Sequence, residues 1–210
     1  MHIHEYKMDY SFLDSNKIVP VVVFNSVDEA LPKLNALSKG GIKVAEITFR
    51  TACAKECIAL ASKECKDMLI GAGTVINAQQ AEDAIDAGAK FIVSPGFSKA
   101  VYEVCAKRDI PLLPGIATPT DIIAVKECGL DIVKFFPAGA FGGVKMLKAL
   151  AGPFPTLKFV PTGGVDAENM KDYLALPQVL AIGGSWMMKG DAEQIEKLSR
   201  EAVKVLEEIK

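Results

Sequence analysis

The chain has 210 residues, of which half are hydrophobic, and its formal net charge at pH 7 is −2. This length fits one α/β-barrel domain, and the apolar fraction is enough for a sizeable core. The near-neutral charge and the lack of a basic patch argue against nucleic acid as a partner. No apolar run approaches the roughly 20 residues that a membrane span requires.

The amino terminus and the cysteines predict a cytoplasmic protein. Residues 1–17 are polar and mixed in charge, without the basic start, apolar centre and cleavage site of a signal peptide. The five cysteines are an odd number and most lie in helix-like segments, so we expect reduced core thiols. Cys53 and Cys57 are four residues apart, but the two histidines, His2 and His4, are distant in the sequence. We therefore expect no zinc site. We also expect no cofactor.

A short helix is predicted for residues 5–15, and strands then alternate with helices to the end of the chain. Short β-branched apolar runs predict strands, and apolar residues spaced three and four apart predict helices. Asn77 and Asp166 are the expected caps of two helices, and Gly88 is an expected helix end. The predicted strands are residues 18–24, 44–49, 68–72, 91–94, 111–114, 131–136, 157–161 and 179–183. The helices that follow them, in the same order, are residues 27–39, 52–65, 78–87, 99–107, 120–128, 143–150, 166–174 and 191–209.

Eight strand–helix units predict an α/β fold, a single-domain (β/α)8 TIM barrel spanning residues 1–210 with a short amino-terminal helix. The strands lack clear apolar–polar alternation, which is typical of parallel sheets covered on both faces. A doubly wound open sheet is the competing fold. Its first strand is often followed by a glycine-rich dinucleotide-binding turn, whereas residues 24–27 here contain no glycine.

One lysine, Lys134, lies in the middle of the apolar strand predicted for residues 131–136. An ammonium group in an apolar run is unfavourable unless it reaches water, finds a partner or loses its proton. Burial favours the neutral amine, which is a nucleophile toward ketones and the starting point of Schiff-base enzymes. The structural alternative is a lysine whose stem packs in the core while its head reaches solvent at the strand end.

Polar side chains lie at the end of the strand predicted for residues 44–49. Glu46, Thr48 and Arg50 share one side of it because side chains alternate along a strand. The carboxyl ends of barrel strands are where active sites form, so these side chains are candidates for function. An ion pair between Glu46 and Arg50 across the strand end is the structural alternative.

Two glycine pairs follow the last two predicted strands, at Gly163-Gly164 and Gly183-Gly184. Glycines let an anion approach backbone N–H groups, and phosphate sites of these barrels commonly form in the last two loops. Each pair could instead make only a tight turn. Their shared position favours a phosphate site.

Six short motifs together resemble those of the 2-dehydro-3-deoxy-6-phosphogluconate (KDPG) and 4-hydroxy-2-oxoglutarate (KHG) aldolases. The resemblance runs from about residue 18 to the last helix. The motifs are Glu46-Ile47-Thr48-Phe49-Arg50-Thr51, Gly71-Ala72-Gly73-Thr74-Val75, Ser94-Pro95-Gly96, Lys134-Phe135-Phe136-Pro137-Ala138, Pro161-Thr162-Gly163-Gly164 and Ile182-Gly183-Gly184-Ser185-Trp186.

This resemblance implies a metal-free class I aldolase on a (β/α)8 barrel, assembled as a homotrimer and acting on a small keto-acid. KDPG would be cleaved to pyruvate and glyceraldehyde 3-phosphate, and KHG to pyruvate and glyoxylate. The family also implies a place in the Entner–Doudoroff pathway. By its pattern, Lys134 is the Schiff-base lysine, Glu46 the general acid and base, and Arg50 and Thr74 the holders of the pyruvate carboxylate.

The same pattern assigns the rest of the site. Pro95 and Phe136 would form apolar walls, and Thr162 would lie near the hydroxylated end of the substrate. The chain departs from better-known members in its amino-terminal arm and in the short loop at residues 187–190. The implied phosphate-binding residues are Gly163, Gly164, Gly184 and Ser185.

Three other functions stay open on the sequence. One is the related aldolase that acts on the galactonate epimer. Another is an isomerase or epimerase that uses Glu46 as a base and forms no imine. The last is a non-catalytic barrel that binds a phosphorylated ligand.

Overall fold

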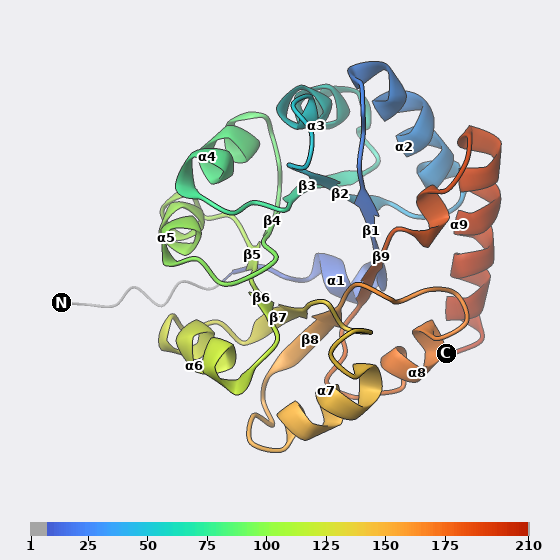
Figure 1. The fold of residues 1–210 in the computed structure, drawn as a ribbon. Coiled ribbons are helices and arrows are strands. Elements are labelled where there is room, and N and C mark those ends of the chain that lie inside the picture. The colour runs from blue at the N-terminus through green and yellow to red at the C-terminus, as the bar shows by residue number, and fades with distance from the viewer. Residues whose placement is uncertain (1–7, 210) are drawn as a thin grey trace.

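Short parallel strands form a ring of segments in the middle of the molecule, and helices surround them (Figure 1). The computed structural model describes residues 8–209. The alternation predicted from the hydrophobic pattern is confirmed. The strands are β1 (Ile18–Val22), β2 (Val44–Thr48), β3 (Leu69–Gly73), β4 (Ile92–Val93), β5 (Leu112–Leu113), β6 (Gly115–Ile116), β7 (Ile132–Phe135), β8 (Lys158–Pro161) and β9 (Ile182–Gly184).

The helices form the outer layer, and α1 alone lies across the middle of the ring in Figure 1. Within residues 8–209, no helix combines the length and the apolar character that a membrane crossing requires. The helices are α1 (Phe12–Ser15), η1 (Val27–Glu29), α2 (Ala30–Lys39), α3 (Ala54–Glu64), α4 (Ala78–Asp86), α5 (Lys99–Arg108), α6 (Pro119–Glu127), α7 (Gly143–Ala151), α8 (Met170–Leu174), η2 (Trp186–Met188) and α9 (Ala192–Glu207).

The strands hydrogen-bond as a curled parallel sheet in two parts. One part has the order β5-β4-β3-β2-β1-β9, and the other has the order β6-β7-β8. Isolated bridges, Phe159 to Val179 and Thr162 to Gly183, connect the β8 side to the β9 side. The described residues therefore confirm an α/β fold with a curled parallel sheet.

Three details of the prediction are wrong. Residues 115–116 are strand β6, not a loop: Pro114 lacks an N–H and separates β5, which pairs with β4, from β6, which pairs with β7. Helix α8 begins at Met170, because residues 167–169 form a turn in which Asp166 accepts backbone N–H bonds without capping the helix. The loop expected after β9 contains the short helix η2.

Other boundaries agree with the prediction within a few residues. The cap at Asn77 is confirmed, since its side chain accepts a hydrogen bond from the Gln80 N–H at 2.9 Å. The predicted helix at residues 5–15 is only partly testable, because residues 5–7 lie outside the described range. Its described portion forms the single turn α1.

Helix α1 packs against the amino ends of the strands. The Phe12 ring stacks on Phe91 with 4.7 Å between centroids, and Leu13 is fully buried. The Tyr10 hydroxyl donates to the carbonyl oxygen of Leu112 at 2.6 Å. This helix covers the end of the ring opposite the loops that follow the strands.

Leu13→Ala is expected to lower the free energy of unfolding by about 2–5 kcal/mol, because it leaves a cavity at a fully buried position. Urea unfolding monitored by circular dichroism measures the loss. The matched control is Asp14→Ala on the same turn, where the side chain is exposed and the change should stay within about 0.5 kcal/mol. A loss for Leu13→Ala that is as small as that expected of the control would show that α1 contributes little to the core.

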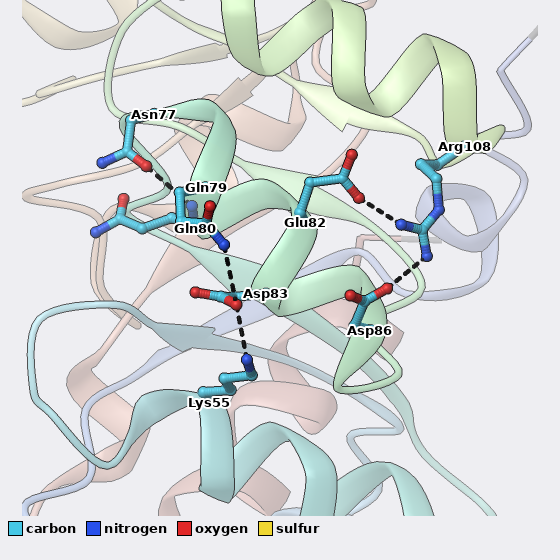
Figure 2. A network of polar contacts seen from close by, with 8 residues as sticks. All are labelled: Lys55, Asn77, Gln79, Gln80, Glu82, Asp83, Asp86 and Arg108. Carbon is cyan, nitrogen blue, oxygen red and sulfur yellow. Dashed lines mark hydrogen bonds and ion pairs between the residues drawn. The ribbon is translucent and has the colours of Figure 1, made fainter.

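Ion pairs connect helix α4 to its two neighbours on the outside of the molecule (Figure 2). Lys55 on α3 lies 2.7 Å from Asp83, and Arg108 on α5 contacts both Glu82 and, at 2.7 Å, Asp86. The hydrogen bond from Lys55 holds the pKa of Asp83 below its usual value. Such partly exposed pairs each add only about 0–1 kcal/mol of stability.

Candidate functional site

The central feature of the site is a buried ion pair between residues 88 positions apart in the sequence. Lys134 Nζ on β7 lies 3.2 Å from Glu46 Oε1 on β2, and the two side chains are only 5% and 3% exposed. The Lys134 side chain is therefore almost wholly buried, which contradicts the structural alternative of a head that reaches solvent. A buried ion pair is weak evidence for stability, because desolvation offsets the attraction. The pair thus calls for a functional explanation.

The partner of Glu46 is Lys134 and not Arg50, so the predicted structural alternative of a Glu46–Arg50 pair is wrong as well. Arg50 instead donates from Nε to the Thr74 hydroxyl at 3.0 Å. Thr74 has a left-handed backbone with φ of 55°, which is uncommon for a residue other than glycine. Arg50 is exposed and Thr74 is half-buried, so a guanidinium and a hydroxyl lie together where β2 and β3 end.

Gly73 makes room for the Glu46 carboxylate. A Cβ at Gly73 would lie 2.1 Å from Glu46 Oε1, which is far closer than atoms can approach. The sequence analysis names this glycine only within the motif Gly71-Ala72-Gly73-Thr74-Val75 and assigns it no role. No local pattern identifies the role, because the strand pairing brings Glu46 and Gly73 together.

An apolar wall lies beside the amine. The centre of the Phe136 ring is 5.3 Å from Lys134 Nζ, a distance suited to an attraction between the ammonium and the ring. Pro95 is close to the same place, because its carbonyl packs against Gly115, the register partner of Lys134. A Cβ at Gly115 would lie 2.2 Å from that carbonyl, which is a second glycine role that the sequence did not reveal.

Thr162 and Gly163-Gly164 follow β8 directly, and the other predicted glycine pair, Gly183-Gly184, forms the end of β9 and not the loop after it. Thr162 is 5% exposed, and its hydroxyl would lie 2.4 Å from a Cβ at Gly183. Gly163 and Gly164 both have left-handed backbones, with φ of 89° and 75°. Within residues 8–209, no protein acceptor is positioned to receive the Gly164 backbone N–H. Gly164 is exposed, so its N–H is open to solvent or to a ligand.

The remaining predicted phosphate residues end β9. Gly184 is buried and packs under Trp186: a Cβ there would lie 2.2 Å from the indole ring. Ser185 follows it and is exposed. The Thr162–Gly183 bridge sets the ends of β8 and β9 side by side, so both predicted phosphate loops belong to one region.

Among the described residues the five cysteines form no disulfide, and they lie in or beside helices, as predicted. Cys57 and Cys105 are fully buried, and burial raises the pKa of each thiol to about 12. Cys53 donates to the Phe24 carbonyl at 3.3 Å. These thiols take no part in the cluster around Lys134.

Residues 10–205 match the family model described as KDPG and KHG aldolase. The chain belongs to this aldolase family. The resemblance predicted from the six motifs is therefore confirmed, and it extends over most of the chain. The members of this family are lyases.

Relatives in the aldolase family cover nearly the whole chain. The KHG/KDPG aldolase of Escherichia coli (strain K12) is 45% identical over 199 residues, which are 92% of this chain and 93% of the relative. The crystal structure of KDPG aldolase from Legionella pneumophila, with pyruvate captured at low pH as a covalent carbinolamine intermediate, is 39% identical with a TM-score of 0.87. That match covers 90% of this chain and 95% of the other.

A second solved relative carries a phosphorylated ligand. The aldolase of Zymomonas mobilis ZM4, crystallised with 3-phosphoglycerate, is 38% identical with a TM-score of 0.87. The match covers 91% of this chain and 93% of that one. The fold of this chain is thus that of the solved KDPG aldolases.

Proposed function

We propose that this protein is a class I aldolase that cleaves KDPG to pyruvate and glyceraldehyde 3-phosphate, and also KHG to pyruvate and glyoxylate. The observation that carries the proposal is the buried contact of 3.2 Å between Lys134 and Glu46. A lysine that is to attack a ketone must first lose a proton, and Glu46 is close enough to accept it. The name of the Escherichia coli relative supports both substrates.

The reaction begins when neutral Lys134 attacks the C2 ketone and gives a carbinolamine. Glu46 passes the proton that it took from Lys134 to the departing hydroxyl, and the loss of water leaves an iminium. The iminium then accepts the electron pair of the breaking C3–C4 bond. Glu46 takes the proton of the C4 hydroxyl, so the aldehyde product leaves neutral at that oxygen. Glu46 then returns a proton to C3 of the enamine, and hydrolysis frees pyruvate and the lysine. The covalent pyruvate in the Legionella relative supports the first step.

The neighbouring residues would orient the substrate. Arg50 and Thr74, joined at 3.0 Å, would bind the pyruvate carboxylate through charge-assisted hydrogen bonds. Phe136 and Pro95 would form the walls beside the reacting amine, and Thr162 would contact the hydroxylated end.

The phosphate would bind at the loops that follow β8 and β9. The donors in this proposal are the backbone of the glycine pairs and the exposed Ser185 hydroxyl. The unused N–H of Gly164 and the 3-phosphoglycerate of the Zymomonas relative support this assignment. The residues are Gly163, Gly164, Gly184 and Ser185.

The alternatives are weaker on physical grounds. A barrel that only binds a phosphorylated ligand gains nothing from burying an amine against a carboxylate, and an isomerase that uses Glu46 as a base needs no lysine beside it. The aldolase for the galactonate epimer stays the nearest alternative, because it would use the same lysine and carboxylate.

The wider proposals concern assembly and setting. We propose one domain over residues 1–210, closed as a (β/α)8 barrel through the β8–β9 bridges and through the chain at Pro114. Resemblance to the family supports a homotrimer without metal or cofactor, and a place in the Entner–Doudoroff pathway. The free thiols support a cytoplasmic location.

Trapping with pyruvate and borohydride tests the proposal. We expect mass spectrometry to show one reduced pyruvyl adduct, and peptide mapping to place it on Lys134. Omitting pyruvate is the control and should give the unmodified mass. A folded protein without the adduct would contradict the class I mechanism and favour an imine-free isomerase or a binding protein.

A further inference from the structure

One side chain outside the predicted site holds the loop after β8 in place. Asn169 Nδ2 donates to the carbonyl oxygen of Gly164 at 2.9 Å, and its Oδ1 accepts the backbone N–H of Asp166 at 3.1 Å. A single amide thus connects two points of the loop at residues 163–166. Asn169 is half-buried and precedes helix α8.

The carbonyl oxygens of this loop are held on one side. The Gly163 carbonyl accepts the N–H of Gly139 at 2.8 Å, and the Gly164 carbonyl accepts the Asn169 amide. In a trans peptide the C=O of one residue and the N–H of the next point in opposite directions. Holding these two carbonyls therefore turns the N–H groups of Gly164 and Val165 the other way.

Both of those N–H groups are unused by the protein. Within residues 8–209, no acceptor is positioned to receive the N–H of Gly164 or of Val165. Gly164 is exposed, whereas Val165 is buried, and a buried backbone N–H without an acceptor is rare in folded proteins. Consecutive backbone N–H groups that face the same way are typical of anion-binding loops. The predicted phosphate set contains Gly164 but omits Val165.

The two constraints differ in kind. The first is a backbone–backbone hydrogen bond, which no side-chain substitution removes. The second constraint, on the Gly164 carbonyl, depends on the Asn169 side chain alone. Gly163 and Gly164 have positive φ values that few other residues adopt, and glycine has a wide range of backbone conformations. The peptide between Gly164 and Val165 can therefore rotate easily once the Asn169 amide no longer holds it. Asp166 Oδ1 in turn accepts the N–H of Asn169 at 3.2 Å and keeps the amide in reach.

We propose that Asn169 is a positioning residue for the substrate phosphate. It fixes the Gly164–Val165 peptide so that the Val165 N–H joins the Gly164 N–H as a donor. This inference rests on the proposed aldolase function. It predicts that Asn169 matters for KDPG, which carries a phosphate, and not for KHG, which carries none.

The test compares the two substrates in Asn169→Ala. We expect KM for KDPG to rise about tenfold, the scale of one lost hydrogen bond to a charged group, with kcat/KM for KHG unchanged within about twofold. Inhibition of KHG cleavage by inorganic phosphate should weaken in parallel. Asn169→Asp keeps the acceptor for Asp166 but loses the donor to Gly164, so it should lose KDPG affinity at least as strongly.

Asn16→Ala is the matched control. The Asn16 amide also donates to a backbone carbonyl, that of Phe12, at 2.9 Å, but it lies at the opposite end of the strands. This variant should leave the ratio of kcat/KM for the two substrates unchanged. Thermal melting of each variant checks that it is folded.

The outcomes separate the inference from the proposed function. Phosphate inhibition of KHG cleavage is compared between the wild type and the two Asn169 variants. If phosphate inhibits both variants as strongly as it inhibits the wild type, the positioning role is wrong and the aldolase function stands. Equal losses for KDPG and KHG would also overturn it, because they indicate a general structural role. If wild-type protein forms no pyruvyl adduct, the aldolase function itself fails and the inference fails with it.

Discussion

Lys134→Ala is expected to reduce kcat/KM for aldol cleavage by more than about 10⁴-fold, the scale of loss when a covalent nucleophile or its base is removed. The reason is that no other amine lies in the cluster with Glu46: its ion-pair partner among the described residues is Lys134. The pyruvyl adduct should disappear as well. Steady-state cleavage of KDPG and borohydride trapping measure the two effects.

The same substitution has a second consequence that needs a control. Removing Lys134 leaves a carboxylate that is 3% exposed without its partner, and breaking a buried pair in this way costs about 3–5 kcal/mol. The double variant Lys134→Met with Glu46→Gln removes both charges and keeps the side-chain volumes. We expect it to fold well and to be inactive. A stable double variant with near-native cleavage would refute the role of Lys134.

Glu46→Gln is expected to reduce kcat by about 10²–10⁴-fold while the adduct with pyruvate still forms more slowly. Glutamine keeps the shape that Gly73 accommodates and can still accept a hydrogen bond from Lys134, but it cannot carry a proton between C4, C3 and water. Nuclear magnetic resonance of the pyruvate methyl group in heavy water isolates the enamine step. Exchange of its protons should be fast in wild-type protein and slow in the variant.

The control for this variant is Glu196→Gln, which makes the same change in a partly exposed ion pair on α9. It should leave both exchange and cleavage unchanged. Rapid methyl exchange in Glu46→Gln would mean that another group protonates the enamine. Complete loss of the adduct in that variant would instead assign Glu46 a role in forming the imine.

The elements of the chain were predictable because their signals are local. Apolar runs and helical spacings depend on residues a few positions apart, so the order of strands and helices follows from them. The errors lie where a neighbour decides. The strand predicted for residues 111–114 is followed by a second strand at residues 115–116, because the segments on the two sides of Pro114 pair with different strands. Helix α8 begins late because the Asp166 carboxylate binds a turn.

The sequence by itself determined that a lysine lies inside an apolar strand, that Glu46 and Arg50 share one side of another, and that the motifs match one aldolase family. Only the tertiary structure decided that Glu46 pairs with Lys134 and leaves Arg50 to Thr74, that Gly73 provides the space for the carboxylate, and that the Asn169 amide holds Gly164. The physical reason is distance along the chain. A side-chain pattern specifies which face of its own helix or strand a residue occupies. The pairing of Glu46 with Lys134, which are 88 residues apart, depends instead on strand register and sheet curvature, and the whole fold sets these.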